Sequence, residues 1–392
     1  MKLTIIIVSY NVRDYLGQCL RSINRAMSGL DAEVIVVDNC SKDGTVDGLS
    51  KEFPWVRFIK SNRNLGFAKA NNQAIRTSKS EYVLLLNPDT IIGEDVLRYA
   101  LQFMDTNLKA GGAGVRMLRR DGYDALESRR GVPTPMTAFY KMVGLCARFP
   151  YSRRFGRYYM GYLSWNEPSK IEVISGAFCL LRREALEKVG LLDEDFFMYG
   201  EDIDLSYRLL KGGWDNWYLP LRILHYKGES TQKTSFRYVH VFYEAMFIFL
   251  RKHYGHLSVF LGIPIRFGIL FKAIGTLITT WWHKLRAGLG FVSKHKVVDP
   301  QYIFDVSEES KPQCRLLIER YGLTARFLDD TELLLLVDDM QKTGLVYFVY
   351  DTLKYTYHEI LERFSSMAKG NLRIGVYHPE VKILITDNEI MQ

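Results

Sequence analysis

Cysteine is scarce in this sequence and follows no motif. The five cysteines are an odd number, and no two of them form a C-x-x-C pair (Cys19, Cys40, Cys146, Cys179 and Cys314). Such a count indicates neither a disulfide framework nor a zinc site. It favours a reducing compartment, and we expect a cytoplasmic protein.

Long uncharged apolar runs are missing, although 47% of the residues are hydrophobic. The most apolar region, 239–298, is interrupted by Arg266 and Lys272, so it lacks the roughly 20 uncharged residues of a spanning helix. Residues 241–298 hold eight basic residues and one acidic residue. This pattern predicts basic amphipathic helices on a membrane surface, at the inner face of the cell membrane. The alternative is a pair of helices packed on the rest of the protein.

The net charge of +8 and the pI of 9.0 do not by themselves indicate nucleic-acid binding. The basic excess lies beside apolar segments, and no nucleic-acid-binding motif is present. We therefore expect no nucleic-acid partner.

Short apolar runs alternate with helical patterns through the first 90 residues. The runs are β-branched or Leu-rich at 3–8, 33–37, 56–59 and 82–86, with helical patterns at 14–27, 44–52 and 67–77. Continuous apolar strands separated by helices predict an α/β fold with a parallel sheet covered on both faces. The length of 392 residues suggests two or three units. We expect a catalytic domain at 1–238, a helical segment at 239–298 and a small acidic α/β domain at 299–392.

Polar residues follow three of the predicted strands. They are Ser9-Tyr10-Asn11, Asp38-Asn39 and Asn87-Pro88-Asp89. In open α/β sheets ligands bind beyond the carboxyl ends of the strands, so these clusters predict one binding site. Asp89 could bind Mg²⁺ or Mn²⁺ together with substrate phosphates, and Asp38-Asn39 could accept hydrogen bonds from a base or ribose. Each cluster is equally compatible with an ordinary turn.

Acidic residues crowd around an expected helix that begins near Asp202. Six carboxylates fall within twelve residues (Asp193, Glu194, Asp195, Glu201, Asp202 and Asp204). Such crowding is unfavourable unless a cation or a catalytic role offsets the repulsion. A carboxylate with a raised pKa that faces an acceptor hydroxyl would serve as a general base. His225, after the next predicted strand, is by itself more often structural than a ligand.

An irregular basic insertion is expected at 116–160, which holds ten basic and three acidic residues. Long insertions of this kind are usually lids or binding loops, or are partly disordered. From charge alone, Arg129 and Arg130 are candidates to close over a bound substrate, whether it is the donor or the acceptor of a transferred group.

Taken together and in order, the motifs resemble those of a family 2 glycosyltransferase of the A-type fold, in the bacterial rhamnosyltransferase-like branch. They are VSYN (8–11), VVDN (36–39), NRNLGFAKANN (62–72), LLNPDT (85–90), SGAFCLLRRE (175–184), FFMYGEDIDLSYR (196–208) and HYKGEST (225–231). The resemblance spans residues 1 to about 235. It implies a mixed, mainly parallel sheet, followed here by interfacial helices and the small C-terminal domain.

The resemblance also implies roles for single residues. Donor binding would involve Ser9, Tyr10, Asn11, Asp38, Asn39, Asn71 and Asn87. Asp89 would be the remaining metal carboxylate of a D-x-D motif whose first position is Asn87 here, with His225 as a metal or diphosphate contact. Asp202, of the Glu201-Asp202 pair, would be the catalytic base.

The implied reaction is inverting transfer of a sugar from a nucleotide-diphosphate donor. The acceptor would be a hydroxyl of a glycan or lipid-linked saccharide in cell-surface polysaccharide synthesis. Two alternatives are a polyprenyl-phosphate sugar synthase and a non-catalytic, membrane-docked sugar-nucleotide-binding scaffold. Residues 299–392 contain neither a G-x-G-x-x-G motif nor a Walker loop, so nucleotide binding is not expected there.

Overall fold

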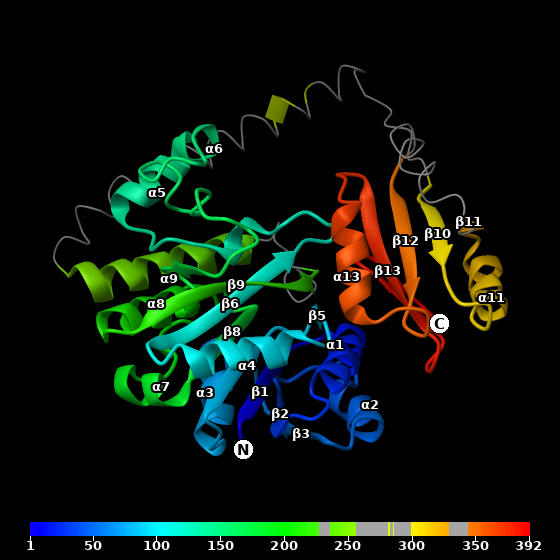
Figure 1. Ribbon diagram of the computed structural model, residues 1–392, viewed down its shortest axis with the longest axis horizontal. Helices are drawn as coiled ribbons and strands as arrows, with labels where there is room; N and C mark the ends of the chain where they lie inside the picture. The colour runs from blue at the N-terminus through cyan, green and yellow to red at the C-terminus, as the bar shows by residue number, and fades with distance from the viewer. Residues whose placement is uncertain (227–235, 256–280, 283–284, 286–298, 329–343) are drawn as a thin grey trace.

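The described residues of the protein form two β-sheets with helices around each (Figure 1). This computed structural model describes residues 1–226, 236–255, 281–282, 285, 299–328 and 344–392. The first sheet has nine strands, and the second has six. In Figure 1 the second sheet, coloured orange to red, lies beside the part of the first that contains β5 and β9.

The first part of the larger sheet is parallel, as the alternating pattern predicts. Its strands lie in the order β3-β2-β1-β4 and are β1 (Leu3–Ser9), β2 (Ala32–Asp38), β3 (Val56–Lys60) and β4 (Tyr82–Leu86). Helices α1 (Arg13–Ala26), α2 (Thr45–Glu52) and α3 (Phe67–Thr77) connect them. Each expected strand and helix is present within two residues of its predicted ends.

The second part makes the sheet mixed. It continues in the order β8-β6-β9-β5, with β7 on β9, through β5 (Thr90–Ile92), β6 (Ala110–Leu118), β7 (Ser169–Ile171), β8 (Phe178–Arg182) and β9 (Asp215–His225). Strand β8 is antiparallel to β4 and β6, and β5 is antiparallel to β9. Helices α4 (Val96–Thr106), α7 (Arg183–Val189) and α8 (Glu201–Lys211) complete this part. The mixed, mainly parallel A-type fold is therefore confirmed.

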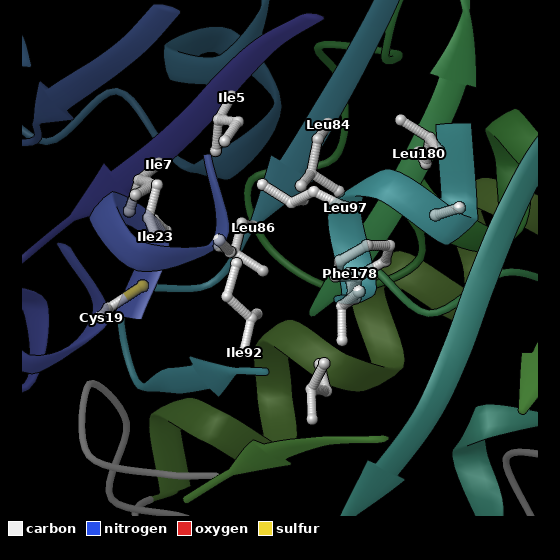
Figure 2. Packing of buried hydrophobic residues seen from close by; sticks show 14 of the residues in the cluster. Ile5, Ile7, Cys19, Ile23, Leu84, Leu86, Ile92, Leu97, Phe178 and Leu180 are labelled. Atoms are coloured by element: carbon white, nitrogen blue, oxygen red, sulfur yellow. The ribbon is translucent and has the colours of Figure 1, made fainter. Parts of the chain in front are cut away.

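Both faces of the larger sheet are buried. On one face, Ile5 and Ile7 of β1 and Leu84 and Leu86 of β4 pack against α1 and α4 (Figure 2). The opposite face packs against α3, α7 and α8. Full burial of one such aliphatic side chain contributes about 1.5–3 kcal/mol, which explains why these strands are apolar along their whole length.

The basic insertion at 116–160 is more ordered than the sequence predicts. It begins inside β6 and contains η1 (Leu126–Ser128), α5 (Pro135–Met142) and α6 (Leu145–Arg148). The Thr134 side chain accepts a hydrogen bond from the Thr137 amide, and Pro135 takes the first helical position. Both are typical starts of a helix.

Helix α9 (Phe236–Tyr254) packs on the larger domain. Ala245 and Phe249 are buried in a cluster with Val132, Val173 and Phe196. For α9 the structure shows the packed alternative, while most of 256–298 lies outside the described residues. Within the described ranges, no helix is both long and apolar enough to cross a bilayer. The boundary at 238/239 stays a prediction.

A small α/β unit follows, as expected for 299–392. Its strand order is β11-β10-β12-β13-β14-β15, from β10 (Gln301–Asp305), β11 (Thr324–Phe327), β12 (Val346–Asp351), β13 (Leu372–His378), β14 (Ile383–Thr386) and β15 (Ile390–Met391). Its described helices are α11 (Lys311–Tyr321) and α13 (Tyr357–Ser366). The charged segment LLLLVDDMQ (333–341), for which the sequence predicts a helix, lies outside the described residues.

The two sheets share one hydrophobic cluster. Tyr15, Ile91 and Tyr226 of the larger domain pack with Phe348 and Phe364 of the smaller one. Polar contacts add to this, including the Tyr15 hydroxyl donating to the Thr386 carbonyl at 2.9 Å. The small domain is thus docked against β5, which directly follows Asp89, and against β9, which ends at His225.

Glu94 ties the two domains together at the start of α13. Its two carboxylate oxygens accept hydrogen bonds from the amides of Tyr357 and His358, each at 2.9 Å. These amides have no partner within the helix, and a carboxylate at a helix N-terminus is electrostatically favourable. Thr356 and Glu359 complete the start of α13 with a capping box.

We expect Glu94→Ala to lower the free energy of unfolding by about 1–2 kcal/mol, because two amides at the start of α13 lose a charged acceptor. Urea unfolding followed by tryptophan fluorescence measures this. The control is Glu362→Ala on the same helix, whose side chain is 62% exposed, with an expected change below about 0.5 kcal/mol. Equal effects of the two variants would contradict the role of Glu94.

Candidate active site

Ser9 and Asp38 end neighbouring strands and lie side by side. They are paired in register at the carboxyl ends of β1 and β2, and both are buried. One Asp38 oxygen, Oδ2, accepts a hydrogen bond from the Ser41 amide at 3.1 Å. The other, Oδ1, and the Ser9 hydroxyl have no hydrogen-bond partner in the described part of the chain. Buried polar atoms without partners at a strand end indicate a place where a ligand binds.

The two residues after Ser9 differ in what their side chains do. Tyr10 is exposed at the sheet edge, where an aromatic ring can stack on a base. Asn11 adopts a left-handed conformation with φ of 53°, which asparagine tolerates. Its side-chain oxygen accepts a hydrogen bond from the Lys42 amide at 2.7 Å, so Asn11 holds the neighbouring loop.

Asn39 and Asn71 contact the loop that leads into α3. Asn39 accepts from the Leu65 amide and donates to the Gly66 carbonyl, so both ends of its amide are engaged in shaping that loop. Asn71 donates to the Phe67 carbonyl, and its buried oxygen has no hydrogen-bond partner within the described ranges. Asn71 therefore still has an acceptor to offer a donor molecule.

Gly66 marks a close approach that the sequence did not single out. Its φ is +81°, and a Cβ there would meet the Phe197 carbonyl oxygen at 2.5 Å. The next amide, of Phe67, donates to that same carbonyl at 2.8 Å. Only glycine fits this position. The contact holds the loop before α3 against the loop before Glu201.

Strand pairing brings Asp89 and His225 together. Thr90, the first residue of β5, lies opposite His225, which is the last residue of β9 and does not follow the strand as expected. His225 Nε2 is 3.3 Å from Asp89 Oδ1 and 3.2 Å from the Asn87 side-chain nitrogen. All three residues are at least partly buried. The site thus unites three residues separated by up to 138 positions.

The residues at Asp89 fit a divalent cation that is completed by substrate. In the described ranges, no group of three His, Cys, Asp or Glu side chains could hold a metal ion. Asp89 and His225 supply two ligand types, and an amide oxygen could come from Asn87. Mg²⁺ commonly binds one or two carboxylates and takes its other ligands from phosphates and water. A two-ligand site therefore fits a nucleotide-diphosphate complex better than a resident metal.

Asp202 lies in the first turn of α8 and is held by three donors. Its Oδ2 accepts from Arg130 at 2.5 Å and from the Gly176 amide at 3.2 Å, and its Oδ1 accepts from the Ile203 amide at 2.8 Å. Burial alone would lower the pKa of Arg130, but the Asp202 carboxylate raises it, so Arg130 stays charged. The basic insertion thus reaches the candidate site through Arg130.

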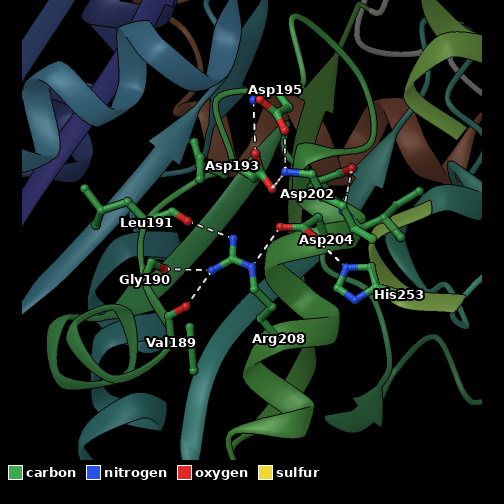
Figure 3. Close-up of polar contacts among 12 residues, drawn as sticks. Val189, Gly190, Leu191, Asp193, Asp195, Asp202, Asp204, Arg208 and His253 are labelled. Atoms are coloured by element: carbon green, nitrogen blue, oxygen red, sulfur yellow. Dashed lines mark hydrogen bonds and ion pairs between the residues drawn. The ribbon is translucent and has the colours of Figure 1, made fainter. Parts of the chain in front are cut away.

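Most of the acidic cluster is neutralised by basic side chains (Figure 3). Lys252 pairs with Asp193 and Asp195, while Arg208 and His253 pair with Asp204. Arg76 pairs with Glu194. Crowding alone was therefore a poor indicator of catalysis, because long-range ion pairs offset the repulsion at these positions.

Glu201 is the member of the cluster with a raised pKa. Only 6% of it is exposed, and its Oε2 has no hydrogen-bond partner among the residues described. Burial raises the pKa of Glu201 to about 8, and the negative charge of Asp202 adds to the shift. Glu201 is therefore protonated at neutral pH and can donate a hydrogen bond.

Residues 4–190 match the model of the family "Glycosyl transferase family 2". The chain carries a family 2 glycosyltransferase domain. It is a glycosyltransferase, as the motif resemblance predicted. The matched residues include Ser9, Asp38, Asn71 and Asp89, while Asp202 and the rest of α8 lie beyond them.

Two relatives of this glycosyltransferase are themselves named as sugar transferases. An N-acetylglucosaminyl-diphospho-decaprenol L-rhamnosyltransferase of Mycobacterium tuberculosis is 29% identical over 264 residues, 63% of this chain and 83% of that protein. A low-salt glycan biosynthesis hexosyltransferase of Haloferax volcanii is 29% identical over 53% of this chain and 61% of that protein. The solved structure of TarS residues 1–349 from S. aureus gives a TM-score of 0.42 at 20% identity, over 63% of this chain and 64% of that one.

Arg129 and Arg130 of the glycosyltransferase point to different places. Arg129 is 2% exposed, and its guanidinium lies 3.5 Å from the centre of the Trp165 ring. It donates to the Leu163 carbonyl. Burial lowers the pKa of Arg129. Arg129 is thus a packing residue of the insertion, and Arg130 alone contacts the acidic pair.

The buried Glu201 makes the stability of the glycosyltransferase depend on pH. The pKa of Glu201 in the folded state lies above the ordinary glutamate value of 4.5, so the native state binds more protons than the unfolded state between pH 4.5 and about 8. Stability therefore falls as pH rises through this window. In the parent, we expect the free energy of unfolding to fall by on the order of 2 kcal/mol between pH 5.5 and 7.5 because of Glu201. We expect Glu201→Gln to lack this fall.

Urea unfolding of both proteins at several pH values measures this difference. The control is Glu194→Gln, which changes a partly exposed carboxylate of the same cluster that is paired with Arg76, and it should keep the parental slope. Parallel pH profiles for the parent and Glu201→Gln would contradict the raised pKa.

Proposed function

We propose that this glycosyltransferase transfers a sugar, with inversion, from a nucleotide-diphosphate donor to a hydroxyl of a glycan or lipid-linked saccharide. The supporting observation is that two consecutive residues, Gly176 and Ala177, contact both the Asn87-Pro88-Asp89 segment and Asp202. The Ala177 carbonyl accepts from the Asn87 amide at 3.0 Å, while the Gly176 amide donates to Asp202. Asp202 is thereby held next to the strand end that carries Asp89.

On the donor side, the free acceptors at the strand ends fit a nucleoside. Ser9, Asp38 Oδ1 and the Asn71 oxygen are buried and can accept from base or ribose. Tyr10 offers a ring for stacking. The base is then bound at the β1–β2 edge, and the diphosphate extends towards Asn87 and Asp89.

Asp89 and His225 would hold Mg²⁺ or Mn²⁺ at the diphosphate. When bound, the ion supplies positive charge to the diphosphate as it leaves. Asn87, which replaces a second carboxylate, reduces the negative charge around the ion. His225 is held in place by β9, so the pair is oriented before the donor binds.

On the acceptor side, Asp202 acts as the general base. A carboxylate offers about four acceptor positions, and three are used by Arg130, Gly176 and Ile203, which leaves one on Oδ1. The acceptor hydroxyl gives its proton to Asp202 as its oxygen bonds to the anomeric carbon, and the bond from that carbon to the diphosphate breaks. In-line attack opposite the diphosphate inverts the anomeric centre.

A hydroxyl acceptor is favoured over a polyprenyl phosphate, because a phosphate is already anionic and needs no base. A non-catalytic scaffold is disfavoured, because Asp38, Asp89, Glu201 and Asp202 are all present and oriented. We propose a cytoplasmic enzyme, peripheral at the inner face of the cell membrane, in cell-surface polysaccharide synthesis. The rhamnosyltransferase relative makes L-rhamnose on thymidine diphosphate the first donor to test.

A donor screen tests the proposal. Nucleotide sugars are incubated with the full chain, with and without Mn²⁺ or Mg²⁺, and free nucleotide diphosphate is measured with saccharide, polyprenyl-phosphate or no acceptor. We expect one donor to be consumed faster with metal and with a saccharide acceptor. Consumption of no donor, together with unchanged nucleotide binding in Asp89→Ala, would overturn the transferase mechanism.

A further inference from the structure

The basic insertion exposes a group of large apolar side chains around α5 and α6. We call residues 135–155 the α5–α6 lobe. Six apolar residues of this lobe are each at least 43% exposed: Met136, Phe139, Met142, Val143, Phe149 and Tyr151. In Figure 1 both helices lie at the edge of the molecule, beside α9. Gathered apolar side chains on one surface mark a contact with a partner or a membrane.

The lobe has a packed interior of its own. Thr137 of α5 and Cys146 of α6 are buried, and Tyr140 packs edge-on against Phe155 at 5.0 Å between ring centres. The apolar residues therefore stand on a fixed surface.

The charge around the lobe has one sign. Residues 128–166 contain seven basic residues and no Asp or Glu. Arg148, Arg153 and Arg154 are exposed, and none of the three forms an ion pair with any described carboxylate. Uncompensated positive charge beside apolar side chains matches the interface of a bilayer with anionic head groups.

We propose that the α5–α6 lobe docks the protein on an anionic lipid bilayer. The apolar side chains enter the head-group region, and Arg148, Arg153 and Arg154 contact lipid phosphates. A nucleic acid does not explain the apolar residues, and an apolar protein partner does not explain the unpaired arginines.

The lobe lies next to the proposed catalytic base. Arg130 contacts Asp202, and α5 begins five residues later at Pro135. Docking through the lobe would bring the acceptor side of the site to the membrane, where a lipid-linked saccharide resides. This step rests on the proposed function, whereas the docking itself does not.

Vesicle co-sedimentation of the full chain, without donor or acceptor, tests the docking. Phosphatidylcholine vesicles with and without phosphatidylglycerol are compared. We expect Met136→Ser/Met142→Ser/Tyr151→Ser to weaken binding to anionic vesicles by at least about tenfold. Arg148→Gln/Arg153→Gln should weaken it by about 25-fold, since each basic residue near an anionic surface contributes about fivefold. The same charge variant should leave the weak binding to neutral vesicles unchanged.

The matched control is Tyr99→Ser/Leu108→Ser/Leu353→Ser, three apolar residues of similar exposure elsewhere on the chain. Circular dichroism establishes that each variant is folded. Parental binding by the lobe variants, equal losses in the control, or no binding of the parent to anionic vesicles would overturn the proposal. Because no sugar is present, failure of the transferase mechanism would leave this result unchanged.

Discussion

Asp202→Asn is expected to lower kcat for glycosyl transfer by about 10²- to 10⁴-fold, the usual contribution of a general base. The amide keeps the size of the side chain and can still accept from Arg130, but it cannot take a proton. The proposed nucleotide-binding residues Ser9 and Asp38 are untouched, so KM for the donor should change little. Steady-state kinetics with a saturating acceptor measure both constants.

Two matched variants make the role of Asp202 testable. Asp195→Asn alters the same residue type in the same cluster, where the side chain is 59% exposed and paired with Lys252, and it should keep parental activity. Glu201→Gln retains a hydrogen-bond donor in place of a protonated acid and should lose far less activity than Asp202→Asn. If Glu201→Gln instead shows the larger loss, the base is Glu201.

The parallel half of the sheet was predictable because its inner strands, β1, β2 and β4, are mostly buried on both faces. The runs at 5–8 and 82–86 are apolar without interruption, as expected of strands in a sheet that is covered on both faces. Strand β6 was not identified, because its sequence is rich in glycine. A Cβ at Gly111 would lie 2.6 Å from Trp214, and one at Gly112 would lie 2.7 Å from Ile174. These glycines are required by close contacts with residues that are distant in sequence, so no local sequence pattern could predict them.

The candidate site residues could be predicted from their position at strand ends, but the contacts that each of them makes could not. Asn39 and Asp38 are neighbours, yet one is engaged in the Gly66 loop and the other keeps a free oxygen. Glu201 and Asp202 are adjacent on α8, and only Asp202 meets Arg130, 72 residues away. Adjacent residues on a helix point about 100° apart, so their side chains enter different surroundings. Composition alone cannot predict which of the two side chains meets a basic partner.

The docking of the small domain was also hidden in the sequence. Glu94 follows the Asp89 segment and caps a helix more than 260 residues later. Because β5 lies between Asp89 and Glu94, the cap supports the same segment that carries the proposed metal carboxylate. The C-terminal unit, to which no chemistry could be assigned, is thus part of what holds the donor side in place.

Asp89→Asn is expected to remove the metal dependence of nucleotide-diphosphate binding and to lower kcat/KM by about 10²- to 10³-fold. Because Asn87 is already neutral, this change leaves the tripeptide without negative charge. His225 alone would then bind the metal ion more weakly than Asp89 and His225 together. A cation that stabilises a leaving diphosphate contributes several kcal/mol, which corresponds to that range of rate. Calorimetric titration of the nucleotide with Mn²⁺ and with chelator measures the binding effect separately from activity.

Two further variants test whether the effect of Asp89→Asn comes from the loss of a metal ligand. His225→Asn should weaken metal-supported binding less than Asp89→Asn, because a neutral ligand is replaced by another neutral one. Asp47→Asn, on an exposed position of α2, should leave binding and activity as in the parent. If Asp89→Asn still binds nucleotide more tightly with Mn²⁺ than with chelator, Asp89 does not hold the ion. Asp38 would then be the next carboxylate to test, because its free Oδ1 lies at the carboxyl end of β2, which only β1 separates from β4 in the same sheet.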